Sequence, residues 1–223
     1  MANNDELRNK SIYYTKNGKK KEQNLPNNRS QYKNSEFTLK RGEIIRLMDA
    51  TTNFRDRMII ATMYYLGFRR FEVCKIDIRD IDLENGRIKV IGKGNKEAIV
   101  MVGSVFPEYI SNLRMYLQTI RRKEGLLFLS NRNRKLQVSR INQMLDEIAK
   151  KAGITNPNPY KKHLNPHILR HSIARHLKDL KYPNEFVKNY MRHDSIQTTM
   201  DAYGTMSVNE MEDYAIRKRK EEE

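Results

Sequence analysis

The hydrophobic pattern of this chain changes its period, and that change limits the folds that the chain can adopt. Apolar residues recur at helical spacings between about residues 38 and 75, and again from about residue 106 to residue 220. Between these regions, residues 87–91 and 97–102 alternate in the manner of β-strands, and a Gly-Lys-Gly-Asn-Lys turn sequence joins them. The sequence therefore predicts a mainly α-helical fold with a small antiparallel β-sheet.

Capping signals place the ends of the expected helices. Thr38 suits the N-cap of a first helix, Gly67 ends a second one, and a short helix follows at residues 69–75. The later helices are expected at residues 106–122, 138–152, 167–180, 183–191, 195–203 and 208–220. Prolines suited to helix starts and a glycine suited to a helix end support these bounds: Pro107, Pro166, Pro183 and Gly153.

The charge balance indicates a polyanionic partner. Lysine and arginine number 43 against 27 acidic residues, so the net charge is +16, which suits nucleic acid or an anionic membrane surface. No apolar run approaches the roughly 20 residues of a membrane span, so we expect no membrane partner. With a single cysteine, Cys74, the chain is expected in a reducing setting. We expect a cytoplasmic, nucleoid-associated protein, or one in the host cytoplasm if its source is a virus or plasmid.

The first 36 residues differ from the rest in composition. They are rich in Asn, Lys, Gln and Ser and contain few apolar positions, so we expect residues 1–36 to form a basic arm that is disordered without a partner. A solubilising tail is the alternative interpretation. Residues 37–223 are expected to form one domain whose last helix covers about residues 208–220.

All five histidines lie between residues 163 and 193, which first suggests a metal site. His167 and His171 have the spacing of two ligands on one helix, but no glutamate lies between them and no third ligand is clearly placed. We therefore predict no metal and no cofactor.

Phosphate chemistry suits this basic region better. Metal-free phosphoryl transfer has to neutralise charge on two non-bridging oxygens, which suits the N–H fork of arginine, and lysine or histidine can move protons. A tyrosine can act as the nucleophile and form a covalent intermediate. The chain has 12 tyrosines, so composition alone does not select one.

Two motifs in the first half of the chain resemble those of the tyrosine recombinases, the family of phage-type integrases and Xer-like enzymes. The Gly-Phe-Arg sequence that ends at Arg69, with Glu72 three residues later, resembles the first arginine box of the family. The expected strand–turn–strand around Lys93 resembles the β-hairpin that carries the family's catalytic lysine.

Two further motifs follow in the order that the family shows. His167 and Arg170 resemble the His-x-x-Arg box, and His193 with Tyr203 resembles the last box, in which a histidine precedes the nucleophilic tyrosine by about one helix. The resemblance covers about residues 38–215. It implies the tyrosine recombinase catalytic-domain fold for this part of the chain.

The resemblance also implies which residues bind the phosphate. Arg69 and Arg170 would clamp the scissile phosphate, and His193 would bind a non-bridging oxygen. Glu72 would be a supporting residue that orients the site.

For the proton transfers, the resemblance implies three further roles. Tyr203 would attack phosphorus and leave a 3′-phosphotyrosine, Lys93 would donate a proton to the departing 5′ oxygen, and His167 would act as a base or hydrogen-bond donor near the tyrosine. The family needs neither ATP nor metal for this chemistry.

Neighbouring residues compete for several of these roles. Arg70 could replace Arg69, Lys96 could replace Lys93, and a core aromatic role is open for each tyrosine near the end of the chain. His171 is expected to be structural. One departure from the family pattern stands out, because Arg192 occupies the position before His193 where a glycine is usual; it could alter the turn or add a phosphate contact.

A basic segment at residues 132–143 opens an expected helix with donors that suit phosphates and base edges. The DNA-contact candidates in it are Arg134, Lys135, Ser139, Arg140 and Gln143. A solvated basic face is the alternative.

Together these features predict a site-specific DNA recombinase or integrase that acts on double-stranded DNA, as a monomer in solution and a homotetramer on DNA. Integration or excision of a mobile element and Xer-type resolution of DNA dimers are both open. The alternatives are a type IB topoisomerase-like activity and a DNA-binding remnant or regulator. We further expect the last helix to dock on a neighbouring subunit.

The family usually carries a helical core-binding domain before the catalytic one. Residues 1–36 are too short and too polar for such a domain. We expect either a fragment of a longer protein or a minimal enzyme that holds DNA with its basic arm.

Overall fold

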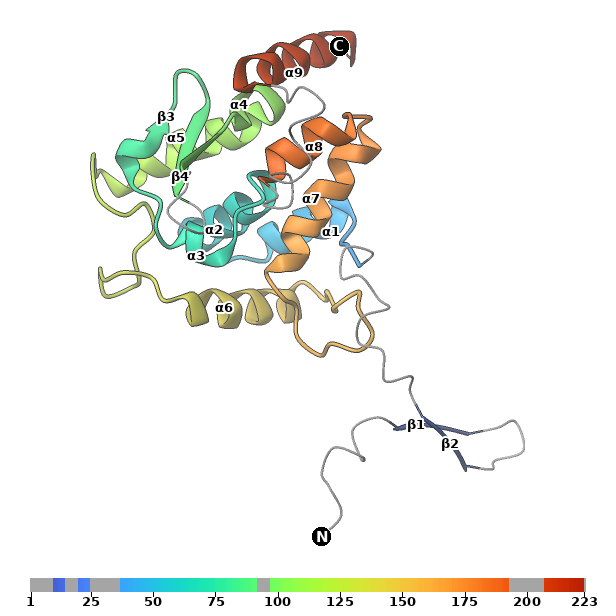
Figure 1. The fold of residues 1–223 in the computed structure, drawn as a ribbon. Helices are drawn as coiled ribbons and strands as arrows, with labels where there is room; N and C mark the ends of the chain where they lie inside the picture. Colours follow the sequence, from blue (N-terminus) through green and yellow to red (C-terminus); the bar gives the residue numbers. More distant parts are fainter. Residues whose placement is uncertain (1–9, 15–19, 25–36, 92–96, 193–206, 223) are drawn as a thin grey trace. The chain divides into compact units, whose positions relative to one another are not determined.

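The chain was analysed as a computed structural model that describes residues 10–14, 20–24, 37–91, 97–192 and 207–222. It divides into two units, residues 1–36 and residues 37–223. In the first unit, β1 (Lys10–Tyr14) and β2 (Lys20–Asn24) pair as an antiparallel hairpin in which Tyr14 lies opposite Lys20 (Figure 1). The disorder of residues 1–36 without a partner stays a prediction.

The second unit is mainly helical, as the hydrophobic periods predict (Figure 1). Its helices in chain order are α1 (Arg41–Asp49), α2 (Phe54–Tyr65), α3 (Arg70–Val73), α4 (Val102–Val105), α5 (Pro107–Ile120), α6 (Val138–Lys151), α7 (His167–Asp179), α8 (Asn184–Met191) and α9 (Val208–Glu222). The expected helix at residues 195–203 lies outside the described residues.

Helix α2 provides the centre of the hydrophobic core. Its residues are buried on nearly every side, and it contacts α1, α3, α5 and α7. Thr62 in α2 lies 2.8 Å from the hydroxyl of Tyr109 in α5, so two buried polar groups satisfy each other. The first arginine box directly follows α2 in the chain, and α7, which carries the second box, packs against α2. The packed core therefore holds both boxes in position.

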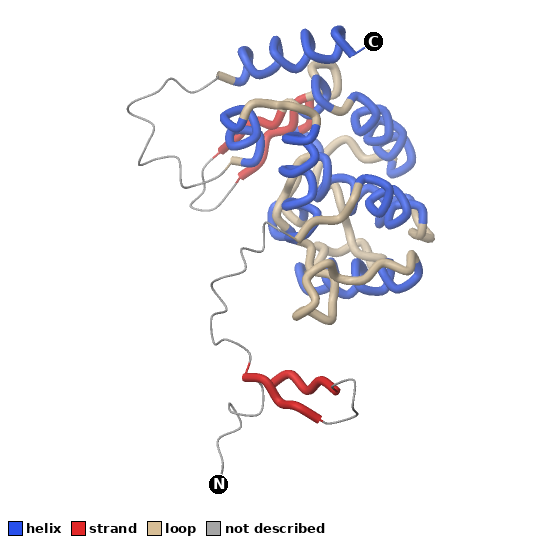
Figure 2. Tube along the Cα trace, turned by 90° about the vertical axis from the view of Figure 1, so that its right-hand side faces the viewer, coloured by secondary structure: helices blue, strands red, loops and turns tan. Residues whose placement is uncertain are grey.

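A three-stranded antiparallel sheet lies beside the helices (Figure 2). Its strands are β3 (Ile81–Asp82), β4 (Arg87–Ile91) and β5 (Glu97–Val100), and Ile88 pairs with Val100. The sequence predicted β4 and β5 but not β3. Gly86 ends the turn before β4 with a φ of +63°, and a Cβ added there would lie 2.6 Å from the Cα of Gly103, so this close approach requires glycine.

The first helix begins at Arg41, so the predicted N-cap at Thr38 is wrong. The backbone N–H of Leu39 donates to Ser172 Oγ in α7 (2.9 Å), which holds the chain extended before the helix. The cap is completed two residues later than predicted, where Glu43 accepts a hydrogen bond from the Lys40 N–H (2.8 Å). A tertiary contact therefore moves the start of this helix.

Helix α9 packs on its own domain. It contacts α4, buries Met211 and Ala215, and places Glu212 in an ion pair with Arg87 of β4 (Figures 1 and 2). The docking of this helix on a neighbouring subunit stays a prediction. No helix among the described residues is long and apolar enough to cross a membrane.

Candidate active site

The first arginine box lies in the turn between α2 and α3. Gly67 follows α2 with a φ of +59°, in the left-handed region, so the turn favours a glycine. Phe68 is buried, which anchors the turn in the core. Arg69 is the extended N-cap residue of α3, with its side chain 22% exposed. The turn therefore places one arginine at the edge of the core.

Glu72 is a buried carboxylate that binds Arg69. Its side chain is 1% exposed and accepts a hydrogen bond from the Arg69 backbone N–H (2.7 Å) and another from Arg69 Nη1 (3.1 Å). A buried carboxylate requires such charged partners. This arrangement restricts the Arg69 guanidinium, which is what the supporting role predicted for Glu72 requires.

Arg170 joins three segments from its position on α7. It is buried, and its guanidinium donates hydrogen bonds to the carbonyl oxygens of Gly67 and Met191. Gly67 lies two residues before Arg69, and Met191 is the last residue of α8. The second arginine box is thus bound to the first box and to the end of α8.

His167 is the first residue of α7 and lies in a positively charged environment. Partial burial of the ring lowers the pKa of His167, and the nearby charges of Arg70, Arg170 and Arg69 lower it further. Because the ordinary pKa of histidine is about 6.5, the ring is neutral at pH 7 and can accept a proton. The effect of three arginines on one ring also indicates that both boxes lie close to it.

Arg69 and Arg70 were competing candidates, and their side chains bind different partners. Arg69 binds the buried Glu72, whereas Arg70 Nη1 donates to Asn142 Oδ1 of α6 (3.0 Å). Arg70 therefore links the first arginine box to α6.

The five DNA-contact candidates are all exposed, three of them on α6 and two on the segment before it: Arg134, Lys135, Ser139, Arg140 and Gln143. The opposite face of α6 is apolar and buried, as an amphipathic helix requires. Arg140 Nη1 forms an ion pair with Glu147 Oε1 (3.1 Å), so an anion would have to compete with this carboxylate.

Three predicted catalytic residues lie outside the described residues. Lys93 falls between β4 and β5, and His193 and Tyr203 fall between α8 and α9. The strands on either side of Lys93 pair as predicted, which confirms the hairpin but not the role of the lysine.

One residue that the sequence flagged only as a departure takes part in this arrangement. Arg192, at the end of α8, donates a hydrogen bond from Nη2 to Glu72 Oε2 (3.2 Å). The arginine in place of the usual glycine was the signal, but the sequence did not indicate which residue it contacts. Among the described residues, no group of three His, Cys, Asp or Glu side chains is placed to hold a metal ion.

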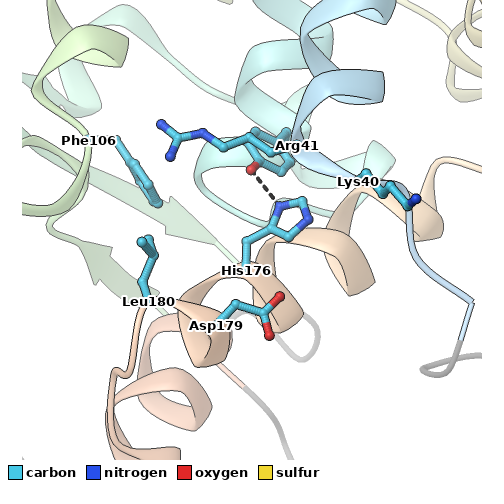
Figure 3. A pocket seen from close by; sticks show the side chains of 7 residues that line it. Lys40, Arg41, Phe106, His176, Asp179 and Leu180 are labelled. Carbon is cyan, nitrogen blue, oxygen red and sulfur yellow. Dashed lines mark hydrogen bonds between the residues drawn. The ribbon is translucent and has the colours of Figure 1, made fainter.

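A separate cavity of about 280 Å³ is lined by residues from α1, α2 and α7 and from the segments beside them (Figure 3). His176 Nδ1 lies 2.7 Å from the Tyr64 hydroxyl, and burial lowers the pKa of His176. Lys40, Arg41 and Asp179 also line this cavity. Of the predicted catalytic residues that the structure describes, Arg69, His167 and Arg170, none lines this cavity.

The helical domain, its three-stranded sheet and the two adjoining arginine boxes define an integrase-type catalytic domain. Residues 38–210 match the sequence profile described as the phage integrase family. The chain therefore belongs to the phage integrase family.

Named relatives and solved structures agree with this assignment. The chain is 37% identical over 152 residues to the tyrosine recombinase XerD of Staphylococcus saprophyticus, covering 66% of this chain and 48% of the relative. It is 32% identical over 154 residues to the tyrosine recombinase XerC of Corynebacterium glutamicum, with coverages of 67% and 48%. The chain thus spans about half the length of these relatives.

The crystal structure of XerA recombinase superposes with a TM-score of 0.62 at 29% identity, covering 82% of this chain and 65% of that one. The XerH site-specific recombinase bound to its difH substrate gives a TM-score of 0.59 at 23% identity, covering 83% and 54%. These likenesses establish the tyrosine recombinase catalytic-domain fold that the motifs predicted.

Proposed function

We propose that this chain is the catalytic part of a site-specific DNA recombinase that cleaves and rejoins strands through a 3′-phosphotyrosine intermediate. The observation that carries the proposal is the convergence of the two arginine boxes. Arg69 and Arg170 come from different parts of the sequence, yet Arg170 binds the carbonyl of Gly67, two residues from Arg69. Both arginines also lower the pKa of His167, so a basic cluster surrounds a neutral imidazole.

These residues supply what a tyrosine nucleophile needs. A tyrosine hydroxyl has an ordinary pKa of about 10, so it attacks at neutral pH only beside a proton acceptor and positive charge. In the proposed reaction, the Tyr203 oxygen bonds to phosphorus while its proton passes to the neutral His167. The bond from phosphorus to the 5′ oxygen breaks, and Lys93 gives that oxygen a proton.

Rejoining reverses these steps. A 5′ hydroxyl attacks the phosphotyrosine and returns its proton to Lys93, and the tyrosine oxygen leaves with a proton from His167. The ester conserves the energy of the broken strand, so no further reactant is required. Arg69, Arg170 and His193 would bind the non-bridging oxygens, where negative charge increases in the transition state, and removal of one such donor should cost about 100-fold to 1,000-fold in rate.

We propose that α6 and the segment before it contact the DNA. The exposed donors on α6 lie beside the arginine boxes, because Asn142 of the same helix accepts a hydrogen bond from Arg70. The net charge of +16 favours phosphate contacts over a wide surface. We further propose a monomer in solution and a homotetramer on double-stranded DNA.

Covalent trapping tests the proposal. A pool of nicked duplexes with a randomised central region is incubated with the protein in EDTA, and covalent adducts are separated on a denaturing gel. Sequencing of the trapped DNA then provides a defined substrate. We expect an adduct with the unsubstituted protein and none with Tyr203→Phe.

The outcomes separate the proposal from its alternatives. An adduct that Tyr203→Phe retains would assign the nucleophile to another residue, and no adduct with any protein would indicate a DNA-binding remnant. Relaxation of supercoiled DNA without strand exchange would indicate a type IB topoisomerase-like activity. Mixing Tyr203→Phe with Arg170→Ala then shows whether the tyrosine acts in its own site, because only delivery to a neighbouring site restores cleavage.

A further inference from the structure

Arg192 closes α8 in a backbone conformation that favours glycine. Its φ of +52° and ψ of 53° lie in the left-handed region, where the Cβ of an L-residue is strained. It is also the last described residue before His193. The arginine side chain is therefore present where the backbone alone favours glycine, which directs attention to the contacts that this side chain makes.

That interaction is with the first arginine box. Arg192 Nη2 donates to Glu72 Oε2 (3.2 Å), and the guanidinium lies over the ring of Phe68, 4.5 Å from its centroid. The side chain is 13% exposed, so these contacts are made inside the protein. Two segments 120 residues apart in the sequence are thereby joined.

Glu72 shares its carboxylate between two arginines. Oε2 accepts hydrogen bonds from the Arg69 backbone N–H and from Arg192, and Oε1 accepts one from Arg69 Nη1. Movement of either guanidinium therefore changes the carboxylate that holds the other. The neighbouring residue strengthens the connection, because the carbonyl of Met191 accepts a hydrogen bond from Arg170.

We propose that Arg192 is a positioning residue of the active site, which ties the end of α8, directly before His193 in the sequence, to Arg69 through Glu72. This inference rests on the proposed function, because it assumes catalytic roles for those residues. It adds a residue to the site of this chain at a position where the family pattern has a glycine.

The surroundings of Arg192 favour positioning over direct contact with the phosphate. Phe68 covers its guanidinium, and Nε and Nη1 are buried with no hydrogen-bond partner among the described residues. Burial and the charge of Arg69 lower the pKa of Arg192, while Glu72 raises it. The carboxylate of Glu72 is thus the group that holds this guanidinium in place.

Arg192→Gly tests the proposal, and Arg121→Gly is its matched control. Arg121 is an exposed arginine that closes α5 with a φ of +53°. Both substitutions remove one positive charge and place glycine where the backbone favours it, so neither is expected to unfold the domain. They differ in the contact with Glu72.

The measurement is the single-turnover rate of covalent adduct formation on the trapped substrate, together with the dissociation constant for the uncleaved duplex. We expect Arg192→Gly to lower the rate about 10-fold to 100-fold, the usual effect of losing a group that orients a catalytic residue. Arg121→Gly should stay within about twofold of the unsubstituted rate, and the two variants should bind DNA equally well, since both lose one charge.

A double-mutant cycle with Glu72→Gln tests whether Arg192 acts through Glu72. If it does, the double variant is no slower than Glu72→Gln alone. Multiplied rate effects would overturn the inference, and so would equal rates for Arg192→Gly and Arg121→Gly. If the unsubstituted protein forms no adduct at all, the proposed function is wrong, and so is this inference. If the adduct forms equally fast with Arg192→Gly, the inference alone is wrong and the proposed function stands.

Discussion

Two arginine–glutamate pairs in this domain have the same separation and opposite exposure, so they allow a direct test of what burial contributes. Arg69 Nη1 lies 3.1 Å from Glu72 Oε1, and Arg140 Nη1 lies 3.1 Å from Glu147 Oε1. The Glu72 side chain is 1% exposed, whereas that of Glu147 is 57% exposed. Replacing each glutamate by glutamine removes the same charge in two environments.

The expected loss at Glu72 follows from its contacts. The carboxylate accepts three hydrogen bonds, two from Arg69 and one from Arg192, and glutamine keeps a single acceptor oxygen. Arg192 is largely buried, with its side chain 13% exposed, so water replaces this contact poorly. Removing one member of a buried ion pair costs about 3–5 kcal/mol, which we expect for Glu72→Gln. Glu147→Gln should cost about 1 kcal/mol or less, because solvent screens that pair.

Urea denaturation followed by circular dichroism measures both variants. With a slope of about 2–3 kcal/mol per molar urea, a loss of 3–5 kcal/mol lowers the midpoint by roughly 1–2.5 M, and Glu147→Gln should lower it by less than about 0.5 M. Midpoints for the two variants that agree within error would refute the reasoning. Such a result would mean that Glu72 does not hold the two arginines in the folded protein.

Three further predictions concern the pH dependence, the sheet and α6, the helix that we propose contacts DNA. Burial lowers the pKa of the three histidines of α7 below the ordinary value of about 6.5, so the folded protein binds fewer protons at these rings than the unfolded chain does. The free energy of unfolding should therefore fall as the pH drops from 7 to 5. Equal urea midpoints at pH 7.5 and pH 5.5 would contradict this prediction. The lowered pKa values of the aspartates add a loss of stability only below about pH 4. Gly86→Ala should destabilise the domain by more than about 1 kcal/mol, because the added Cβ would meet Gly103. Gly42→Ala in α1 has open space around the added Cβ and should stabilise the domain by about 0.5 kcal/mol. Equal thermal midpoints for the two variants would count against the close approach of Gly86 to Gly103. Glu147→Gln should tighten DNA binding about twofold to tenfold at low salt, because it removes the carboxylate that pairs with Arg140. The gain should disappear at high salt and in a protein that also carries Arg140→Gln. A gain that persists without Arg140 would show that DNA binding does not use this arginine.

Much of the fold could be predicted because its signals are local. Pro107 starts α5 and Gly153 follows α6 with a φ of +63°, and both depend on the backbone preferences of single residues. The predicted start at Thr38 failed because the hydrogen bond that decides it joins Leu39 to Ser172, 133 residues away. The short strand β3 was missed because two residues are too few to show an alternation.

In the candidate site, too, features with a local sequence signal could be predicted and long-range contacts could not. The two arginine boxes were found because each is a short motif, and the structure places them side by side. The ion pair between Arg192 and Glu72 spans 120 residues, and a single sequence carries no signal for such a pair. What the sequence did show was an arginine where a glycine is usual before the histidine, which marked the position but did not indicate its partner.

The way in which the arginines are held bears on what they can bind. Arg170 donates to two backbone carbonyls, which are uncharged acceptors that fix its guanidinium. Among the described residues, Glu72 is the carboxylate that bonds to both Arg69 and Arg192, so one negative charge serves two guanidinium groups. A carboxylate for each arginine would hold them as firmly but would cancel the charge that attracts a phosphate. Carbonyls and a shared carboxylate thus restrict these guanidinium groups, and the proposed transfer of a phosphodiester to Tyr203 would use their positive charge.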